Sequence, residues 1–162
     1  MNQEFSDLSE TILGICREAR VKLATAESCT GGMVAAALTD IAGSSDVVER
    51  GFVTYSNEAK TELLGVPAAM IAAHGAVSAQ VATAMVQGVL ARAPVDLAVS
   101  VTGIAGPGGA TSGKPVGLVY FGIARKGGDC RVERHTFHGD RAAVRAAATE
   151  RALELLLEAA RE

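Results

Sequence analysis

A short apolar run, a polar glycine-rich turn and a helix-forming stretch follow one another early in the chain. Residues 21–26 form the apolar run, residues 27–32 read Glu-Ser-Cys-Thr-Gly-Gly, and residues 33–41 favour a helix. This order predicts a β-strand that enters a helix through a tight turn. Because such a turn gathers a hydroxyl, a thiol and free backbone N–H groups, it is typical of the places where α/β proteins hold nucleophiles and bind anions.

Helical and strand-like segments alternate along the rest of the chain. Residues with N-cap preferences precede several of the helical segments, and glycines follow them. The expected N-caps are Thr30, Asn57, Ser78 and Asp140. We expect strands over residues 21–26, 47–55, 96–101, 116–124 and 130–137, and helices around residues 8–19, 30–41, 57–64, 68–74, 78–94 and 140–159.

The order of these segments predicts the fold class. Residues 126–129 read Lys-Gly-Gly-Asp, which is typical of a hairpin turn, so the last two strands are expected to be antiparallel and the sheet mixed. Residues 1–162 are therefore expected to form a single α/β domain with three α/β/α layers and about five strands.

Composition and charge exclude several classes of protein. The net charge is −3 and the charges are mixed, whereas a nucleic-acid-binding protein usually shows a basic face. The 3 cysteines are widely spaced, which suggests neither a disulfide framework nor a zinc site. Residues 1–10 do not resemble a signal peptide, and no apolar run approaches the roughly 20 residues that span a bilayer. We expect a soluble cytoplasmic protein with no metal, no cofactor and no membrane or nucleic-acid partner.

The turn at residues 27–32 is the first candidate site. Ser28 at the strand end could be a nucleophile, with the N–H groups of Gly31 and Gly32 as oxyanion donors. Cys29 is a rival nucleophile, because a helix N-terminus lowers the pKa of a thiol. If both residues keep strand geometry, only one of them faces the site. The alternatives are a helix cap for Ser28 and a small buried side chain for Cys29.

The segment from Tyr55 to Lys60 is the second candidate. A serine nucleophile needs a proton acceptor, and His74, His135 and His138 lie without obvious acidic partners. Lys60 falls in the first turn of its expected helix, where the dipole disfavours an ammonium, so it could act as the base. Tyr55 could relay the proton or hold the substrate. The alternative is an exposed, solvated lysine.

Two further segments could bind a ligand. Residues 102–115 are too rich in glycine and proline for a regular element, and they leave the end of a buried strand, where open α/β sheets place ligands. Their N–H groups could form an anion nest, or the loop could be a flexible crossover. Arg141 and Arg145 share a helix face near the helix N-terminus, where a bound phosphate or carboxylate would offset their repulsion. The alternative is simple solvation.

Several of these segments together resemble the CinA C-terminal domain family, the nicotinamide-nucleotide amidases. The match covers roughly residues 10–157, in order and with family-like spacing. The resembling segments are Thr-Ala-Glu-Ser-Cys-Thr-Gly-Gly at 25–32, Gly-Phe-Val-Thr-Tyr-Ser-Asn-Glu-Ala-Lys at 51–60, His-Gly-Ala-Val-Ser at 74–78, Val-Thr-Gly-Ile-Ala-Gly-Pro-Gly-Gly at 101–109, Lys-Pro-Val-Gly at 114–117 and Phe-His-Gly-Asp-Arg at 137–141.

The resemblance implies hydrolysis of the carboxamide of nicotinamide mononucleotide to the acid, with release of ammonia, in pyridine nucleotide salvage. Longer members carry an additional N-terminal domain, so this chain looks like a stand-alone amidase. By hypothesis, Ser28 attacks the amide carbon, and Lys60 with Tyr55 takes and returns the proton. N–H groups of the turn at 30–32, or of the loop at 103–109, would stabilise the oxyanion. Arg141, Arg145 and the glycine loop would hold the phosphate and ribose of the nucleotide. The residues expected to bind the substrate are Glu27, Cys29, Thr30, Gly31, Gly32, Asn57, Thr102, Gly103, Gly106, Gly108, Arg141 and Arg145.

Two other functions use the same residues. A non-catalytic module could bind a pyridine nucleotide through the glycine loop and the arginines, with Ser28 as a cap only. An amidase could also act on another small amide. Self-association is expected in each case, with a homodimer favoured.

Overall fold

The sheet contains five strands in the order β2-β1-β3-β4-β5. This computed structural model describes residues 2–162, so Met1 of the predicted domain lies outside the described residues. Strands β1, β2 and β3 are parallel, and β4 and β5 are antiparallel to their neighbours. The strands are β1 Leu23–Glu27, β2 Val48–Val53, β3 Leu97–Gly103, β4 Leu118–Arg125 and β5 Cys130–Thr136.

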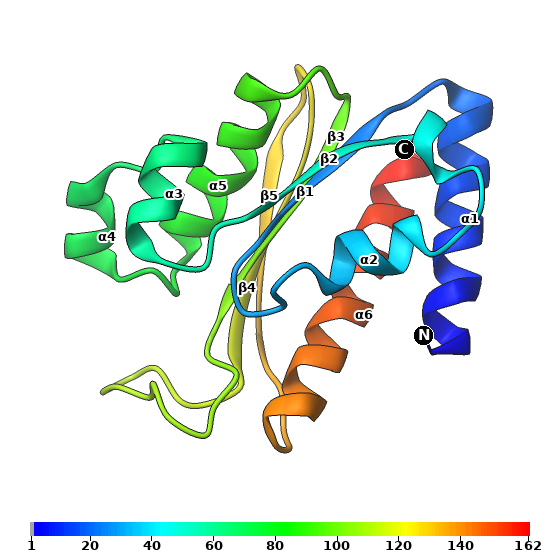
Figure 1. Ribbon diagram of the computed structural model, residues 1–162. Coiled ribbons are helices and arrows are strands. Elements are labelled where there is room, and N and C mark those ends of the chain that lie inside the picture. Colours follow the sequence, from blue (N-terminus) through cyan, green and yellow to red (C-terminus); the bar gives the residue numbers. More distant parts are fainter. Residues whose placement is uncertain (1) are drawn as a thin grey trace.

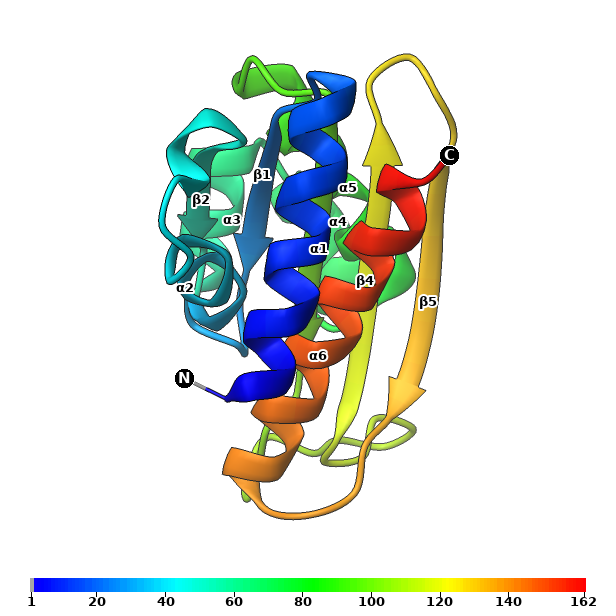
Figure 2. The same ribbon diagram turned by 90° about the vertical axis from the view of Figure 1, so that its right-hand side faces the viewer.

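Helices cover both faces of the sheet (Figure 1). The helices α1 Gln3–Ala19, α2 Met33–Thr39 and α6 Arg141–Ala160 lie on one face, and α1 and α6 run side by side across it (Figure 2). The helices α3 Asn57–Leu64, α4 Ala68–His74 and α5 Ala79–Arg92 lie on the other face. A 3₁₀ turn, Ser44–Asp46, precedes β2. The predicted three-layer α/β/α domain with a mixed sheet is confirmed.

Each face of the sheet buries its own apolar cluster. Ile12 of α1 and Leu155 of α6 pack with Phe121 of β4 in the first cluster, and Met85 of α5 packs with Ala98 of β3 in the second. These positions follow from the helical periodicity of α1 and α6 and from strands that are buried on both sides. Within residues 2–162, no helix is both long and apolar enough to cross a bilayer.

Two predicted helix starts differ from the structure. The side chain of Thr30 caps no helix, because α2 begins at Met33 with Gly32 as N-cap in a left-handed conformation (φ 104°). The Thr30 hydroxyl instead donates to a carboxylate oxygen of Glu27. Helix α3 is capped by Ser56, whose hydroxyl accepts from the Ala59 N–H, so Asn57 is its first residue. The predicted caps Ser78 and Asp140 are confirmed.

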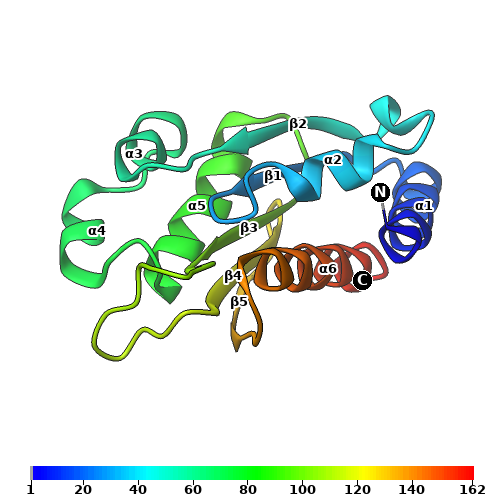
Figure 3. The ribbon, with the colours of Figure 1, turned by 60° about the horizontal axis from the view of Figure 1, so that its bottom comes forward.

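The chain crosses the sheet on opposite sides after β1 and after β2. The connection from β1 to β2 carries α2 over one face, and the connection from β2 to β3 carries α3, α4 and α5 over the other. This reversal between the adjacent parallel strands β1 and β3 is a topological switch point, where open α/β sheets leave a crevice at the carboxyl ends of the strands. Figure 3 views the molecule from this end.

Candidate active site

Ser28 is the first residue after β1, at the switch point. Its N–H donates to the Val101 carbonyl at 2.9 Å, which continues the pairing of β1 with β3 by one residue. Its side chain is largely buried, and its hydroxyl oxygen lies 3.0 Å from Lys60 Nζ. Ser28 caps no helix, because the N-cap of α2 is Gly32. The hydroxyl is therefore held toward a potential base rather than toward a helix end.

Lys60 is buried, with 1% of its surface exposed, so the alternative of a solvated lysine is wrong. Besides Ser28, its Nζ reaches the carbonyls of Thr54 at 2.8 Å and Tyr55 at 3.3 Å. All of these partners are neutral. Burial lowers the pKa of the Lys60 ammonium, and the nearby Cys29 opposes this shift only as a smaller effect. A lysine with a lowered pKa can accept a proton at a pH where an exposed lysine cannot.

Cys29 also lies at the cavity, but its thiol is not activated. Burial, the largest effect, and the negative charge of Glu27 raise its pKa to about 11. The expectation that a helix N-terminus lowers this pKa is therefore wrong. The physical reason is that burial disfavours the thiolate, and the Glu27 carboxylate, which bonds N–H groups of α2, adds a negative charge nearby. Ser28 and Cys29 both line the cavity, and both follow Glu27, the last residue of β1, so the alternation of side chains along a strand does not apply to them.

The Tyr55 phenol bonds Arg141 rather than Lys60. Tyr55 is 59% exposed, and its phenol oxygen accepts a hydrogen bond from Arg141 Nη2 at 2.9 Å. The part of Tyr55 that meets Lys60 is the backbone carbonyl. Among the hydrogen bonds of residues 2–162, none joins the Tyr55 phenol to Lys60 or to Ser28. This arrangement favours a substrate-holding role for the phenol over the proton relay.

The two arginines of α6 have different partners, although they lie one helical turn apart. Arg141 lines the cavity and donates to the Gly106 carbonyl at 2.9 Å as well as to Tyr55. Arg145 donates to the carbonyls of Cys29 at 3.1 Å and Thr30 at 3.3 Å. Arg145 is not among the residues that line the cavity, so its guanidinium holds the turn after β1 instead.

The cavity between these residues has a volume of about 250 Å³. Lys60 and Arg141 are the charged side chains in its lining, and no carboxylate lines it among the described residues. It is lined by Ser28, Cys29, Tyr55, Asn57, Lys60, Ala76, Val77, Thr102, Gly103, Ile104, Ala105, Gly106, Gly108, Gly109 and Arg141. An anionic ligand therefore fits this cavity better than a cationic one.

The loop after β3 forms one wall of the cavity and brings free donors to it. The N–H groups of Gly106, Gly108 and Gly109 make no backbone hydrogen bond in the described part of the chain. By contrast, the Gly31 N–H donates to the Ser28 carbonyl at 3.0 Å. Gly103, the last residue of β3, has no room for a side chain, since a Cβ there would lie 2.7 Å from a methyl carbon of Val119 in β4.

Some of the predicted site residues lie outside the lining. Glu27, Thr30, Gly31, Gly32 and Arg145 surround the turn but do not line the cavity. Sequence reasoning assigned no role to Ala76 and Val77, which line it from the segment between α4 and α5. The His-Gly-Ala-Val-Ser segment was a signal for them, and the Thr102 hydroxyl bonds the Ala76 carbonyl at 2.9 Å.

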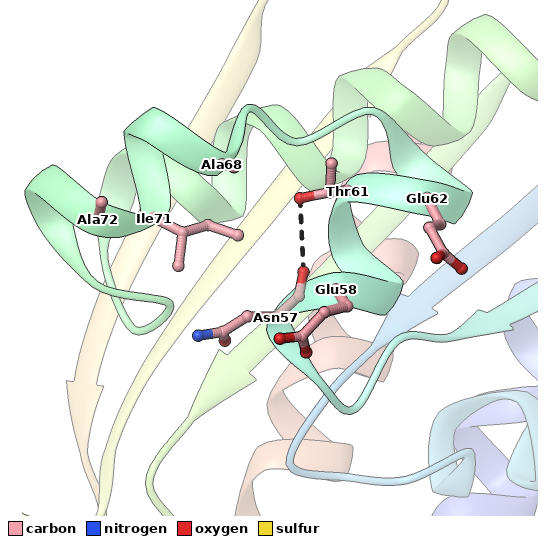
Figure 4. A pocket seen from close by; sticks show the side chains of 7 residues that line it. All are labelled: Asn57, Glu58, Thr61, Glu62, Ala68, Ile71 and Ala72. Carbon is pink, nitrogen blue, oxygen red and sulfur yellow. Dashed lines mark hydrogen bonds between the residues drawn. The ribbon is translucent and has the colours of Figure 1, made fainter.

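A larger cavity of about 490 Å³ lies between α3 and α4 (Figure 4). Asn57 lines both cavities, whereas the other residues of the larger one are Glu58, Thr61, Glu62, Ala68, Ile71 and Ala72. This lining contains two carboxylates but no serine, cysteine or lysine. The groups for nucleophilic chemistry are therefore in the smaller cavity.

Known proteins of similar sequence match most of this chain. The nicotinamide-nucleotide amidohydrolase PncC of Escherichia coli K12 is 50% identical over 155 residues, which is 96% of this chain and 94% of that protein. A CinA-like protein of Citrifermentans bemidjiense is 53% identical over 154 residues, which is 95% of this chain and 37% of that protein. The chain spans about a third of the length of the first curated relatives that it matches.

Solved structures show the same fold. The crystal structure of the competence/damage inducible protein CihA from Agrobacterium tumefaciens has a TM-score of 0.95 and 43% identity, and the match covers 98% of this chain and 96% of that one. A family model for the CinA C-terminal domain matches residues 5–160. Because that match takes in every strand and every residue of the cavity, the chain belongs to the CinA C-terminal domain family.

Proposed function

We propose that the chain is a nicotinamide-nucleotide amidohydrolase that converts the carboxamide of nicotinamide mononucleotide to the carboxylic acid and ammonia. The observation that carries the proposal is the 3.0 Å distance between Ser28 Oγ and Lys60 Nζ, both buried at the wall of one cavity. The name and 50% identity of the Escherichia coli relative support this substrate.

Ser28 and Lys60 can carry the reaction in two halves. Neutral Lys60 takes the proton of the Ser28 hydroxyl as the oxygen bonds to the amide carbon. The tetrahedral intermediate collapses, the C–N bond breaks, and Lys60 passes its proton to the leaving nitrogen, which departs as ammonia. Water then attacks the acyl-serine, Lys60 takes a proton from it and returns one to Ser28, and the carboxylic acid leaves.

The negative charge on the carbonyl oxygen needs donors that are already in place. The N–H groups of Gly106, Gly108 and Gly109 are free of backbone partners, and these residues line the cavity. The Gly31 N–H is engaged with the Ser28 carbonyl, and Gly31 does not line the cavity. We therefore assign the oxyanion donors to the loop after β3.

Arg141 is the group that we assign to the nucleotide phosphate. Among the described residues, its guanidinium bonds only neutral acceptors, a carbonyl and a phenol, so these partners do not compensate its charge. A planar guanidinium binds phosphate oxygens through paired hydrogen bonds. We assign contacts with the rest of the nucleotide to Tyr55 and Asn57, because they line the same cavity.

The first experiment measures ammonia release from nicotinamide mononucleotide by the purified protein. We expect release by the wild type and a loss of at least about 10³-fold in Ser28→Ala. The matched control is Ser45→Ala, because Ser45 is exposed in the 3₁₀ turn before β2. Saturable binding of the nucleotide by the wild type without any ammonia release would contradict the proposal and favour a binding module.

A further inference from the structure

Glu27 is a carboxylate with no exposed surface, directly before the proposed nucleophile. It is the last residue of β1, and its backbone carbonyl accepts from the Thr54 N–H of the segment after β2. Its side chain accepts three hydrogen bonds, from the Thr30 hydroxyl at 2.6 Å, the Val34 N–H at 2.9 Å and the Ala35 N–H at 3.0 Å. All three partners are donors, which is the environment that a buried carboxylate requires.

Glu27 supplies the cap that α2 lacks. The N-cap residue Gly32 has no side chain, so it cannot accept from the first N–H groups of the helix. The Glu27 carboxylate takes the Val34 and Ala35 N–H groups instead, and a negative charge at this end of a helix is favourable. One side chain therefore joins the end of β1 to the start of α2.

We propose that Glu27 is a positioning residue, which holds the Ser28 hydroxyl within reach of Lys60. Two side chains bond the turn between β1 and α2. Arg145 donates to two of its backbone carbonyls, and the Glu27 carboxylate accepts from its Thr30 hydroxyl. Without the Glu27 carboxylate, the Thr30 hydroxyl and two helix N–H groups lose their acceptors. The turn then moves, and a displacement of about 1 Å at a reacting group costs about 10²-fold in rate.

This inference rests on the proposed amidase function and on Ser28 as its nucleophile. Glu27 does not line the cavity, so its loss acts on the position of Ser28 and not on substrate binding. Glu27→Gln keeps the size of the side chain but places an NH₂ group where an acceptor is needed. The prediction that Glu27 binds the substrate is thus replaced by a role in holding the nucleophile.

The test compares Glu27→Gln and Glu27→Ala with Glu10→Gln, an exposed carboxylate of α1. All assays are run at a temperature where circular dichroism shows each variant folded. We expect kcat to fall at least about tenfold in Glu27→Gln and about 10²-fold in Glu27→Ala, with KM within about threefold of the wild type. The pH at which kcat/KM rises should not move, because no hydrogen bond joins Glu27 to Lys60 in the described part of the chain, and the pKa of Lys60 is shifted by burial and Cys29. A wild-type kcat in folded Glu27→Gln, or a raised KM at unchanged kcat, would overturn the proposal.

A second readout separates this proposal from the choice of substrate. A fluorophosphonate probe reacts with an activated serine: the Ser28 Oγ–P bond forms, the P–F bond breaks, fluoride leaves and Lys60 takes the hydroxyl proton. The labelling rate is followed by intact mass, with Ser28→Ala as the blank. We expect Glu27→Gln to be labelled at least about tenfold more slowly than the wild type, even if the wild type does not hydrolyse nicotinamide mononucleotide. Equal rates, or no labelling of either protein, would overturn the positioning role.

Discussion

Lys60 Nζ lies 3.0 Å from Ser28 Oγ, and the same amine donates to the Thr54 carbonyl at 2.8 Å. The serine directly follows β1 and the lysine belongs to α3, and these two segments lie on either side of β2 in the chain. Their meeting depends on the parallel pairing of β1 with β2, which brings the segment after each strand to the same edge of the sheet.

Replacing Lys60 by methionine should abolish turnover while the protein stays folded. Methionine fills a similar volume but cannot accept a proton, so we expect kcat to fall about 10²- to 10⁴-fold, the usual range for loss of a general base. Ammonia release under saturating substrate measures this fall. The control is Lys126→Met, in the hairpin turn between β4 and β5. Activity in Lys60→Met within tenfold of the wild type would contradict the role of Lys60 as base.

The lowered pKa of Lys60 also predicts how stability depends on pH. In the folded state this pKa lies below the value in the unfolded chain, about 10.4 for an ordinary lysine. Between the two values the unfolded chain binds more protons, so the contribution of Lys60 to the free energy of unfolding increases as pH rises and is most unfavourable below the folded pKa. Urea unfolding of the wild type and Lys60→Met across this pH range measures how the difference between their free energies of unfolding changes with pH. A constant difference would contradict the lowered pKa.

Arg141→Gln should weaken binding of the nucleotide more than it slows the chemistry. The guanidinium joins the loop after β3 to Tyr55 over the cavity, and we assign it to the phosphate. A lost charged hydrogen bond is worth about 1.5–3 kcal/mol, so we expect KM to rise about 10- to 150-fold. The same variant should be nearly normal with nicotinamide riboside, which has no phosphate. An equal effect on both substrates would contradict the assignment.

Much of the fold and part of the site follow from sequence patterns, because these patterns are local. The strand, turn and helix around Ser28 and the N-cap at Asp140 could be predicted from residue type and spacing. The position of Lys60 within its helix indicated a base, but only the structure shows that it is buried. The homodimer stays a prediction.

The wrong predictions concern side chains whose hydrogen-bond partners lie outside the local sequence pattern. Thr30 has the residue type of an N-cap, yet its hydroxyl bonds Glu27, which reaches past the turn to cap α2 itself. Arg141 and Arg145 share a helix face in the sequence pattern, but they bond different segments. Arg141 bonds the loop after β3, and Arg145 bonds the turn after β1. Such partner choices depend on tertiary packing, which neither propensity nor spacing encodes.

An ion pair remote from the cavity should contribute to stability without affecting catalysis. The hydrogen bond from Arg151, with a smaller contribution from His135, lowers the pKa of Glu133 to about 2. A carboxyl group with a lowered pKa stabilises the folded state above its ordinary pKa of about 4.3, and this contribution is lost as pH falls toward the folded value. The ion pair between Glu133 and Arg151 is partly exposed. We therefore expect Glu133→Gln to lower the free energy of unfolding by at most about 1 kcal/mol at pH 7 and to leave kcat and KM unchanged.

Cys29→Ala is the variant that separates the two possible nucleophiles. Because burial raises the pKa of this thiol to about 11, almost none of it is thiolate at neutral pH, and the substitution should leave kcat within a few-fold of the wild type. The side chain packs in the apolar cluster between the sheet and α6, so its loss should lower the free energy of unfolding by about 1 kcal/mol. Iodoacetamide should accordingly alkylate Cys29 slowly in the folded protein and leave ammonia release intact. If Cys29→Ala abolishes turnover while Ser28→Ala retains it, the thiol is the nucleophile and Lys60 acts on it instead.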